Sequence, residues 1–70
     1  MNNAMMLVAC KSIIVGNDSV IFDYAFMFMD KSVVPVRMVG YTIGDSLESF
    51  VNEAAYIAYS VRSGSYDYER

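Results

Sequence analysis

Hydrophobic side chains occupy nearly every position from Val20 to Met29, and this stretch determines how the rest of the chain is interpreted. Successive side chains of a strand point to opposite faces, so a strand here is apolar on both faces. One face carries Val20, Phe22, Tyr24, Phe26 and Phe28, and the other carries Ile21, Asp23, Ala25, Met27 and Met29. The remaining sequence predicts one helix. We therefore expect another molecule to cover the second face, and the sequence does not decide which of the two faces the helix covers.

Two segments rich in β-branched residues predict strands on either side of this one. Residues 5–15 allow a helix as the alternative, but their last three residues are β-branched and lead into a turn signal at residues 16–19, which favours a strand and a hairpin. Residues 33–43 predict the third strand. Pro35 lacks an N–H, so this strand either lies at an edge or begins its pairing after the proline.

Residues 44–48 predict the start of a helix, with Asp45 as the N-cap and Glu48 closing a capping box. Gly64 is placed for a left-handed C-terminal cap. One face of the helix is apolar, with Leu47, Phe50, Val51, Ala54, Ala58 and Val61 flanked by Ala55 and Ile57. The prediction is an α+β fold, a three-stranded antiparallel sheet with one C-terminal helix packed on one face (βββα). It forms a single domain over residues 1–64, followed by a flexible tail at 65–70.

The composition limits how a chain of seventy residues can be stabilised. A hydrophobic core of this size is only marginally stable, and small domains often gain further stability from subunit contacts, disulfides or metals. Cys10 is the only cysteine and histidine is absent, so we expect no internal disulfide, no metal and no cofactor. A single thiol without a secretory leader predicts a cytoplasmic protein. The apolar runs are shorter than the ~20 residues of a membrane-spanning helix, so no membrane association is expected.

Charge and residue types also narrow the function. The formal net charge is −3 and the five basic residues are scattered, which predicts no autonomous nucleic-acid binding and favours a partner with a basic surface. Without histidine, and with Cys10 in an apolar run typical of a buried thiol, we expect no catalytic residue and no enzyme. Asp23 interrupts the central strand and is expected either to pair with Lys11 or Arg37 across the sheet or to lie where that face is open to water.

Two contact surfaces are predicted from the surplus of methionine and aromatic residues. The acidic, aromatic side of the helix is the candidate partner site, formed by Glu48, Asn52, Glu53, Tyr56 and Tyr59. Tyr66, Asp67, Tyr68 and Glu69 are candidates to extend it. An ordinary solvated helix face is the alternative interpretation. A homodimer is predicted through the sheet face away from the helix, using Phe22, Phe26 and Phe28 or, in the opposite register, Met27 and Met29.

The segment Gly40-Tyr41-Thr42-Ile43-Gly44-Asp45-Ser46-Leu47-Glu48-Ser49, followed by Glu53-Ala54, resembles the strand-to-helix turn of HicB-type antitoxins. That resemblance implies three strands before an alanine-bearing helix, and a domain that neutralises a toxin. In size, acidity and lack of catalytic groups the chain is also similar to small phage-encoded inhibitors, including anti-CRISPR proteins. We therefore expect a non-catalytic module that inhibits or modulates a protein or nucleoprotein target, with a HicB-like antitoxin or regulatory domain as the alternative.

Overall fold

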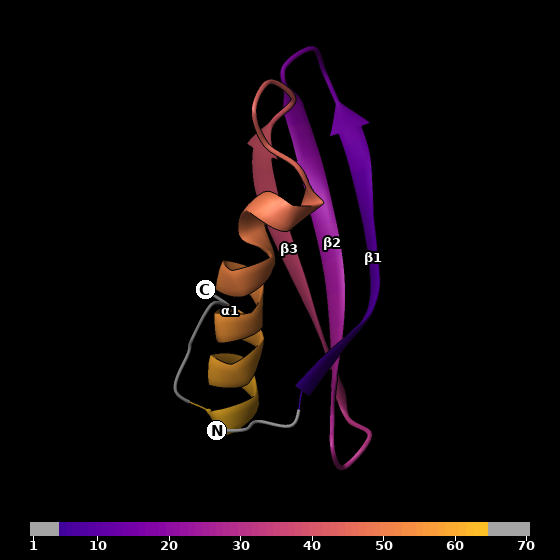
Figure 1. The fold of residues 1–70 in the computed structure, drawn as a ribbon, viewed down its shortest axis with the longest axis vertical. Coiled ribbons are helices and arrows are strands. Elements are labelled where there is room, and N and C mark those ends of the chain that lie inside the picture. Colours follow the sequence, from indigo (N-terminus) through magenta and orange to yellow (C-terminus); the bar gives the residue numbers. More distant parts are fainter. Residues whose placement is uncertain (1–4, 65–70) are drawn as a thin grey trace.

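The computed structural model describes residues 5–64, which form one antiparallel sheet followed by one helix (Figure 1). The strands are β1 (Met5–Val15), β2 (Ser19–Phe28) and β3 (Val33–Tyr41), and a 3-10 turn, η1 (Leu47–Phe50), leads into helix α1 (Val51–Ser63). The strand order is β1-β2-β3, so the most hydrophobic strand is central and Pro35 lies on an edge strand. The predicted βββα fold is confirmed. Residues 1–4 and the predicted tail lie outside the described residues.

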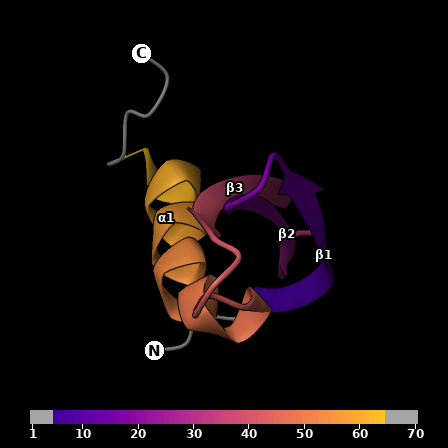
Figure 2. The ribbon, with the colours of Figure 1, turned by 90° about the horizontal axis from the view of Figure 1, so that it is seen from above.

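Helix α1 covers one face of the sheet and lies mainly over β3 and β2 (Figures 1 and 2). The core beneath it contains Val20, Phe22, Tyr24, Phe26 and Val36 from the sheet and Ala54 and Ala58 from the helix. Both alanines are 0% exposed, because their small side chains let the helix approach the sheet closely. Burying each large apolar side chain contributes about 1.5–3 kcal/mol. The helix therefore covers the aromatic face of β2 and leaves the face of Asp23 open.

Strand pairing arranges the open face in rows that cross all three strands. The pairing of β1 with β2 shifts between Leu7 and Ala9, which marks a β-bulge, and is regular from Ala9 to Val15. The rows are Met6–Met27–Val33, Ala9–Ala25–Pro35, Lys11–Asp23–Arg37 and Ile13–Ile21–Val39. Apolar rows thus lie on both sides of a single charged row.

The start of the helix differs from the prediction by one residue. Ser46 is the N-cap of η1, and its N–H donates to Oγ of Ser49 at 2.9 Å. The predicted cap, Asp45, instead accepts a hydrogen bond from the N–H of Tyr41 at 2.7 Å, while Glu48 accepts one from Oγ of Ser46 at 3.0 Å. Asp45 is not the cap because it satisfies a donor at the end of β3.

Two contacts hold the beginning of the helical segment on the sheet. The hydroxyl of Tyr24 donates to the carbonyl of Leu47 at 2.6 Å, and burial raises the pKa of Tyr24. Gly40 lies directly beneath the segment. A Cβ at this position would be 2.8 Å from Oδ2 of Asp45 and 2.9 Å from Cε2 of Phe50, so only glycine fits without a shift of its neighbours.

The last turn of α1 is joined to the loop between β2 and β3. Arg62 donates to Oγ of Ser32 at 3.1 Å, forms an ion pair with Asp30, and places its guanidinium 5.4 Å from the centre of the Phe28 ring. Gly64 ends the helix with φ 82°, which confirms the predicted left-handed cap. Both ends of the helical segment are therefore fixed to the sheet.

Candidate functional site

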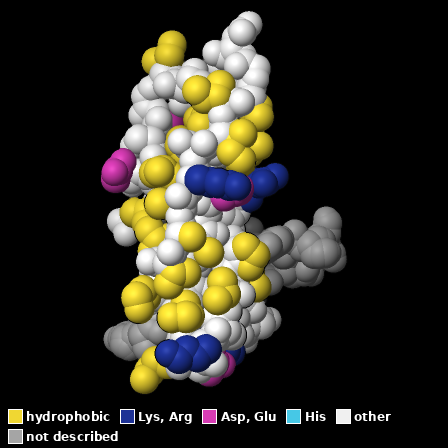
Figure 3. Space-filling view, turned by 90° about the vertical axis from the view of Figure 1, so that its right-hand side faces the viewer, with side chains coloured by type: hydrophobic (Ala, Val, Ile, Leu, Met, Phe, Trp, Pro, Cys, Tyr) yellow, Lys and Arg dark blue, Asp and Glu magenta, His cyan; other side chains and the backbone are white. Residues whose placement is uncertain are grey.

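The open face of the sheet is apolar, and no helix or strand within residues 5–64 packs on it. Met6, Val33 and Val39 are 55%, 51% and 66% exposed on this face. Figure 3 views the molecule from the β1 side and shows hydrophobic side chains above and below a band of basic side chains. In the part of the chain that the structure describes, the prediction that one helix leaves apolar sheet surface uncovered is confirmed.

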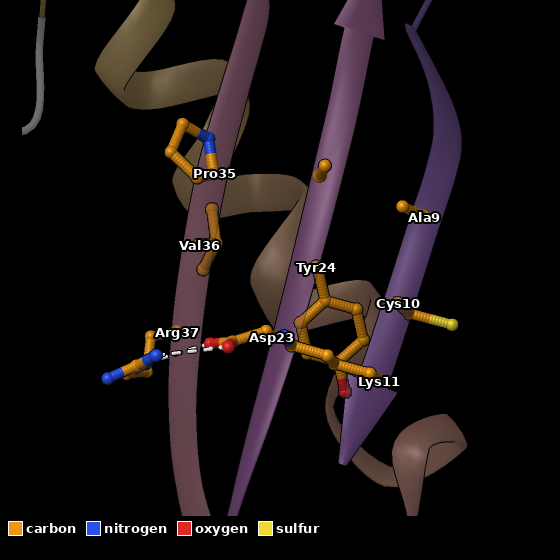
Figure 4. A pocket seen from close by; sticks show the side chains of 9 residues that line it. Ala9, Cys10, Lys11, Asp23, Tyr24, Pro35, Val36 and Arg37 are labelled. Atoms are coloured by element: carbon orange, nitrogen blue, oxygen red, sulfur yellow. Dashed lines mark hydrogen bonds and ion pairs between the residues drawn. The ribbon is translucent and has the colours of Figure 1, made fainter. Parts of the chain in front are cut away.

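The charged row at mid-length of the open face consists of Lys11, Asp23 and Arg37, one from each strand (Figure 4). Arg37 binds Asp23 through two hydrogen bonds, Nε to Oδ1 at 2.8 Å and Nη2 to Oδ2 at 3.0 Å. These bonds hold the pKa of Asp23 below its usual range, and Lys11 adds a smaller effect of the same sign. The predicted cross-strand pair is confirmed, with Arg37 as the partner. The middle of the open face therefore stays charged at neutral pH.

Next to the charged row, the small side chains of Ala9 and Ala25 help to form an open hollow of about 570 Å³. Lys11, Asp23, Pro35 and Arg37 also line this hollow, together with Cys10, Tyr24 and Val36 (Figure 4). Ligand pockets that bury most of a small molecule are enclosed clefts or cavities. This hollow is instead a shallow depression on a broad apolar surface, which is a shape suited to a protruding group of a larger partner.

Strand β1 is a bare edge of the sheet. All of its residues after Met5 are exposed, and its main contact with the helical segment is with η1. Apolar side chains project on both sides of the strand, with Ile14 on the helix side 71% exposed and Ile13 on the open side 37% exposed. Cys10 is exposed as well. The expectation of a buried thiol is wrong, because α1 lies mainly over β3 and β2 and leaves Cys10 uncovered.

Sequence reasoning placed residues 5–15 beside the central strand but did not identify this strand as an uncovered contact edge, although the sequence carries a signal for it. Residues 5–15 form a long apolar segment with no proline and with Lys11 as its one charged residue. Natural edge strands are usually protected by charges, prolines or covering elements. The opposite edge, β3, has such features in Pro35, Arg37 and the adjacent α1. The two edges of this sheet therefore differ in their readiness to pair.

The five residues predicted for the partner site all lie on the outer surface of the helical segment. Glu48 is exposed in η1, and Asn52, Glu53, Tyr56 and Tyr59 are exposed on α1, with the two tyrosines 68% and 52% exposed. The spacing of the α1 residues places them side by side on the helix surface, away from the sheet. The tail residues predicted to extend this patch lie outside the described residues.

The residues predicted for the dimer contact are divided by the position of the helix. Phe22 and Phe26 are 2% and 3% exposed beneath α1, so they belong to the core and are not accessible to a second subunit. Phe28 is half-buried under the guanidinium of Arg62. Met27 lies on the open face, and Met29 is exposed just after the end of β2. The methionine alternative is therefore the one that the structure leaves accessible.

Residues 5–64 contain no group of three His, Cys, Asp or Glu side chains placed to hold a metal ion. No helix in that range is long and apolar enough to cross a membrane. Comparison of the chain with protein-family models, with curated proteins and with solved structures found no match. The exposed surfaces, with their geometry and chemistry, are therefore what indicates a function for this protein.

Proposed function

We propose that this protein is a small non-catalytic binding module that inhibits or modulates a macromolecular partner. The observation that carries the proposal is the uncovered apolar side of the sheet, which includes the open face and both sides of β1. Contiguous exposed apolar surface of this kind marks interaction sites in soluble proteins. The exposed thiol of Cys10 favours a reducing compartment, so the proposal places the protein in the cytoplasm.

The outer surface of the helical segment is the proposed site for the target. Tyr56 and Tyr59 offer rigid amphipathic side chains, which are enriched where proteins bind one another. Asp23 and Asp30 are neutralised by arginine partners, whereas no salt bridge to Glu48 or Glu53 is formed within residues 5–64. Free negative charge is thus present on the helical side. A protein or nucleoprotein target with a basic surface is the electrostatic complement.

The uncovered side of the sheet is the proposed subunit contact of a homodimer. It lies opposite or beside the helix rather than on the helix's outer surface, so a second subunit bound there leaves the proposed target site free. This separation allows one surface to assemble the protein while the other binds the target.

A capture experiment tests the proposed target site. The wild type and the double variant Glu53→Lys/Tyr56→Ala are each immobilised and exposed to host lysate, and the bound proteins are identified by mass spectrometry. Both positions are exposed, so the variant is expected to fold and to lose the target. Asp18→Lys is the matched control, because it makes the same charge reversal at the exposed turn between β1 and β2. Equal capture of the target by all three proteins would contradict the proposed site.

The alternative is a HicB-like antitoxin domain that uses the same helical surface to occlude a toxin. What favours it is the order of three strands before an alanine-bearing helix, which the resemblance implies. Co-expression separates the two possibilities. Rescue of cells from a toxin encoded beside this protein, and loss of rescue in the Glu53→Lys/Tyr56→Ala variant, would favour the antitoxin.

A further inference from the structure

We propose that two copies of this chain join edge to edge, with β1 of one copy paired antiparallel to β1 of the other, so that a single sheet runs through both. The inference rests on the homodimer in the proposed function and specifies its geometry. Its partner is a second copy of the same chain, and its contact is the edge strand rather than the middle of the open face.

The two edges of the sheet are unequally protected against pairing with another strand. Strand β1 is paired on one side only, by β2, and along its outer side backbone N–H and C=O groups have no strand partner within residues 5–64. It contains no proline and one charged residue, and its bulge is confined to the segment between Leu7 and Ala9. Such an edge is a template for another strand. Strand β3, with Pro35 and Arg37, is not.

Strand β1 can pair with a second copy of itself. Antiparallel pairing of identical strands has two-fold symmetry, so the same segment serves as both halves of the contact. The regular segment Ala9–Val15 has Ser12 at its centre. Pairing about Ser12 sets Lys11 opposite Ile13 of the second copy, so two lysines do not face each other directly. It also sets Ile14 opposite Cys10 of the second copy, which covers apolar surface on the helix side.

The charged row on the open face disfavours a dimer that stacks through that face. Stacking two copies through that face would bury Lys11 and the Asp23–Arg37 pair, and taking ions out of water costs several kcal/mol for each ion. Edge pairing leaves this row in solvent. The symmetry axis of antiparallel edge pairing is perpendicular to the sheet. The two copies of α1 therefore lie on the same side of the joint sheet, with both β1 strands between them.

Sedimentation velocity over a range of micromolar concentrations tests the proposal with two matched variants. Ile14→Lys and Val39→Lys each replace an exposed β-branched residue, 71% and 66% exposed, so both are expected to fold. Ile14 lies on β1 and Val39 lies on the open face of β3. We expect a wild-type dimer, an increase of at least about tenfold in its dissociation constant for Ile14→Lys, which corresponds to about 1.4 kcal/mol, and little change for Val39→Lys.

A cysteine pair tests the position of the symmetry axis. In a Cys10→Ser background, Ser12→Cys is expected to form an intermolecular disulfide under mild oxidation, because directly opposed residues of antiparallel strands have Cα atoms about 4.5–5.5 Å apart, within the range that a disulfide spans. Val39→Cys in the same background is the control and is expected to stay reduced. Faster cross-linking of the control would overturn the proposal.

Two results of the sedimentation experiment count against edge pairing. A wild type that sediments as a monomer throughout, or a dimer that Val39→Lys disrupts and Ile14→Lys does not, would overturn edge pairing. Protection of β1 only when a different protein is bound would replace the second copy with a partner strand. None of these results alters target capture through the helical surface. Failure of the capture experiment, with the dimer intact, would instead remove the proposed function and leave the edge contact standing.

Discussion

Replacement of Gly40 by alanine tests how closely the helical segment is seated on the sheet. The added Cβ would lie 2.8 Å from Oδ2 of Asp45, 2.9 Å from Cε2 of Phe50 and 3.1 Å from Cε2 of Phe22. The first of these atoms accepts the hydrogen bond from the N–H of Tyr41. An alanine here therefore forces the beginning of the helical segment and the core residue Phe22 away from the end of β3.

The magnitude follows from two opposing effects. Overpacking a filled core costs about 1–3 kcal/mol. Reduced freedom of the unfolded chain returns about 0.4–1 kcal/mol, because Gly40 does not have a positive φ and alanine can adopt its backbone conformation. The midpoints of these two ranges give a decrease in the free energy of unfolding of about 1.3 kcal/mol. For a domain of this size that corresponds to a decrease in Tm of about 5–10 °C.

Urea and thermal unfolding, followed by circular dichroism, measure the effect. Phe50→Leu removes the ring edge near the new methyl group, so Gly40→Ala should cost less in a Phe50→Leu background, with a coupling of about 0.5 kcal/mol or more. Gly16→Ala is the control, since a Cβ there meets nothing within 4 Å and its cost comes from the positive φ of 76° alone. It should add to Phe50→Leu without coupling. A neutral or stabilising Gly40→Ala would refute the close seating.

Three further predictions concern individual contacts. Lys31 has φ 72° in the loop between β2 and β3, so Lys31→Gly should raise the free energy of unfolding by about 0.5–1 kcal/mol in urea titrations; a decrease would contradict this. Tyr24→Phe leaves the carbonyl of Leu47 without its hydrogen-bond donor, so the free energy of unfolding should fall by about 0.5–1.5 kcal/mol. An unchanged urea midpoint would show that this hydrogen bond contributes nothing to stability. Arg37 lowers the pKa of Asp23 in the folded state, so this stabilisation is present above the unfolded value of 3.8 and is lost as the pH falls below it. The urea midpoint should therefore differ less between about pH 7 and about pH 3 in Asp23→Asn than in the wild type. If the variant shows the same difference as the wild type, the Asp23–Arg37 pair is not the cause of the pH dependence.

Elements set by local patterns could be predicted from the sequence. The order of the strands and helix, the apolar stripe around Ala54 and Ala58, and the cap at Gly64 all follow from periodicity and backbone preference. The cap at the start of the helix was displaced by one residue, because Asp45 and Ser46 are both good N-cap residues. The choice between them depends on the N–H of Tyr41, which belongs to another element.

The face covered by the helix could not be chosen from hydrophobicity, because both faces of β2 are apolar. Asp23 was the useful signal in retrospect. A carboxylate paired with an exposed arginine needs access to water, so its face is the one left open, and the aromatic face with Phe22 and Phe26 becomes the core. The sideways position of α1 over β3 and β2 depends on tertiary packing. For that reason the exposure of Cys10 and of the β1 edge was not foreseen.

Hydrogen exchange of the β1 amides, followed by NMR at low and high protein concentration, tests most directly whether the uncovered side of the sheet is a contact surface. The amides between Ala9 and Val15 that point away from β2 lack strand partners in the isolated chain. Edge pairing predicts that these alternate amides become protected as the concentration rises, while the exposed amides of the turn between β1 and β2 do not change. Rapid exchange of the outward amides at every concentration, and equally with a captured target bound, would contradict the account.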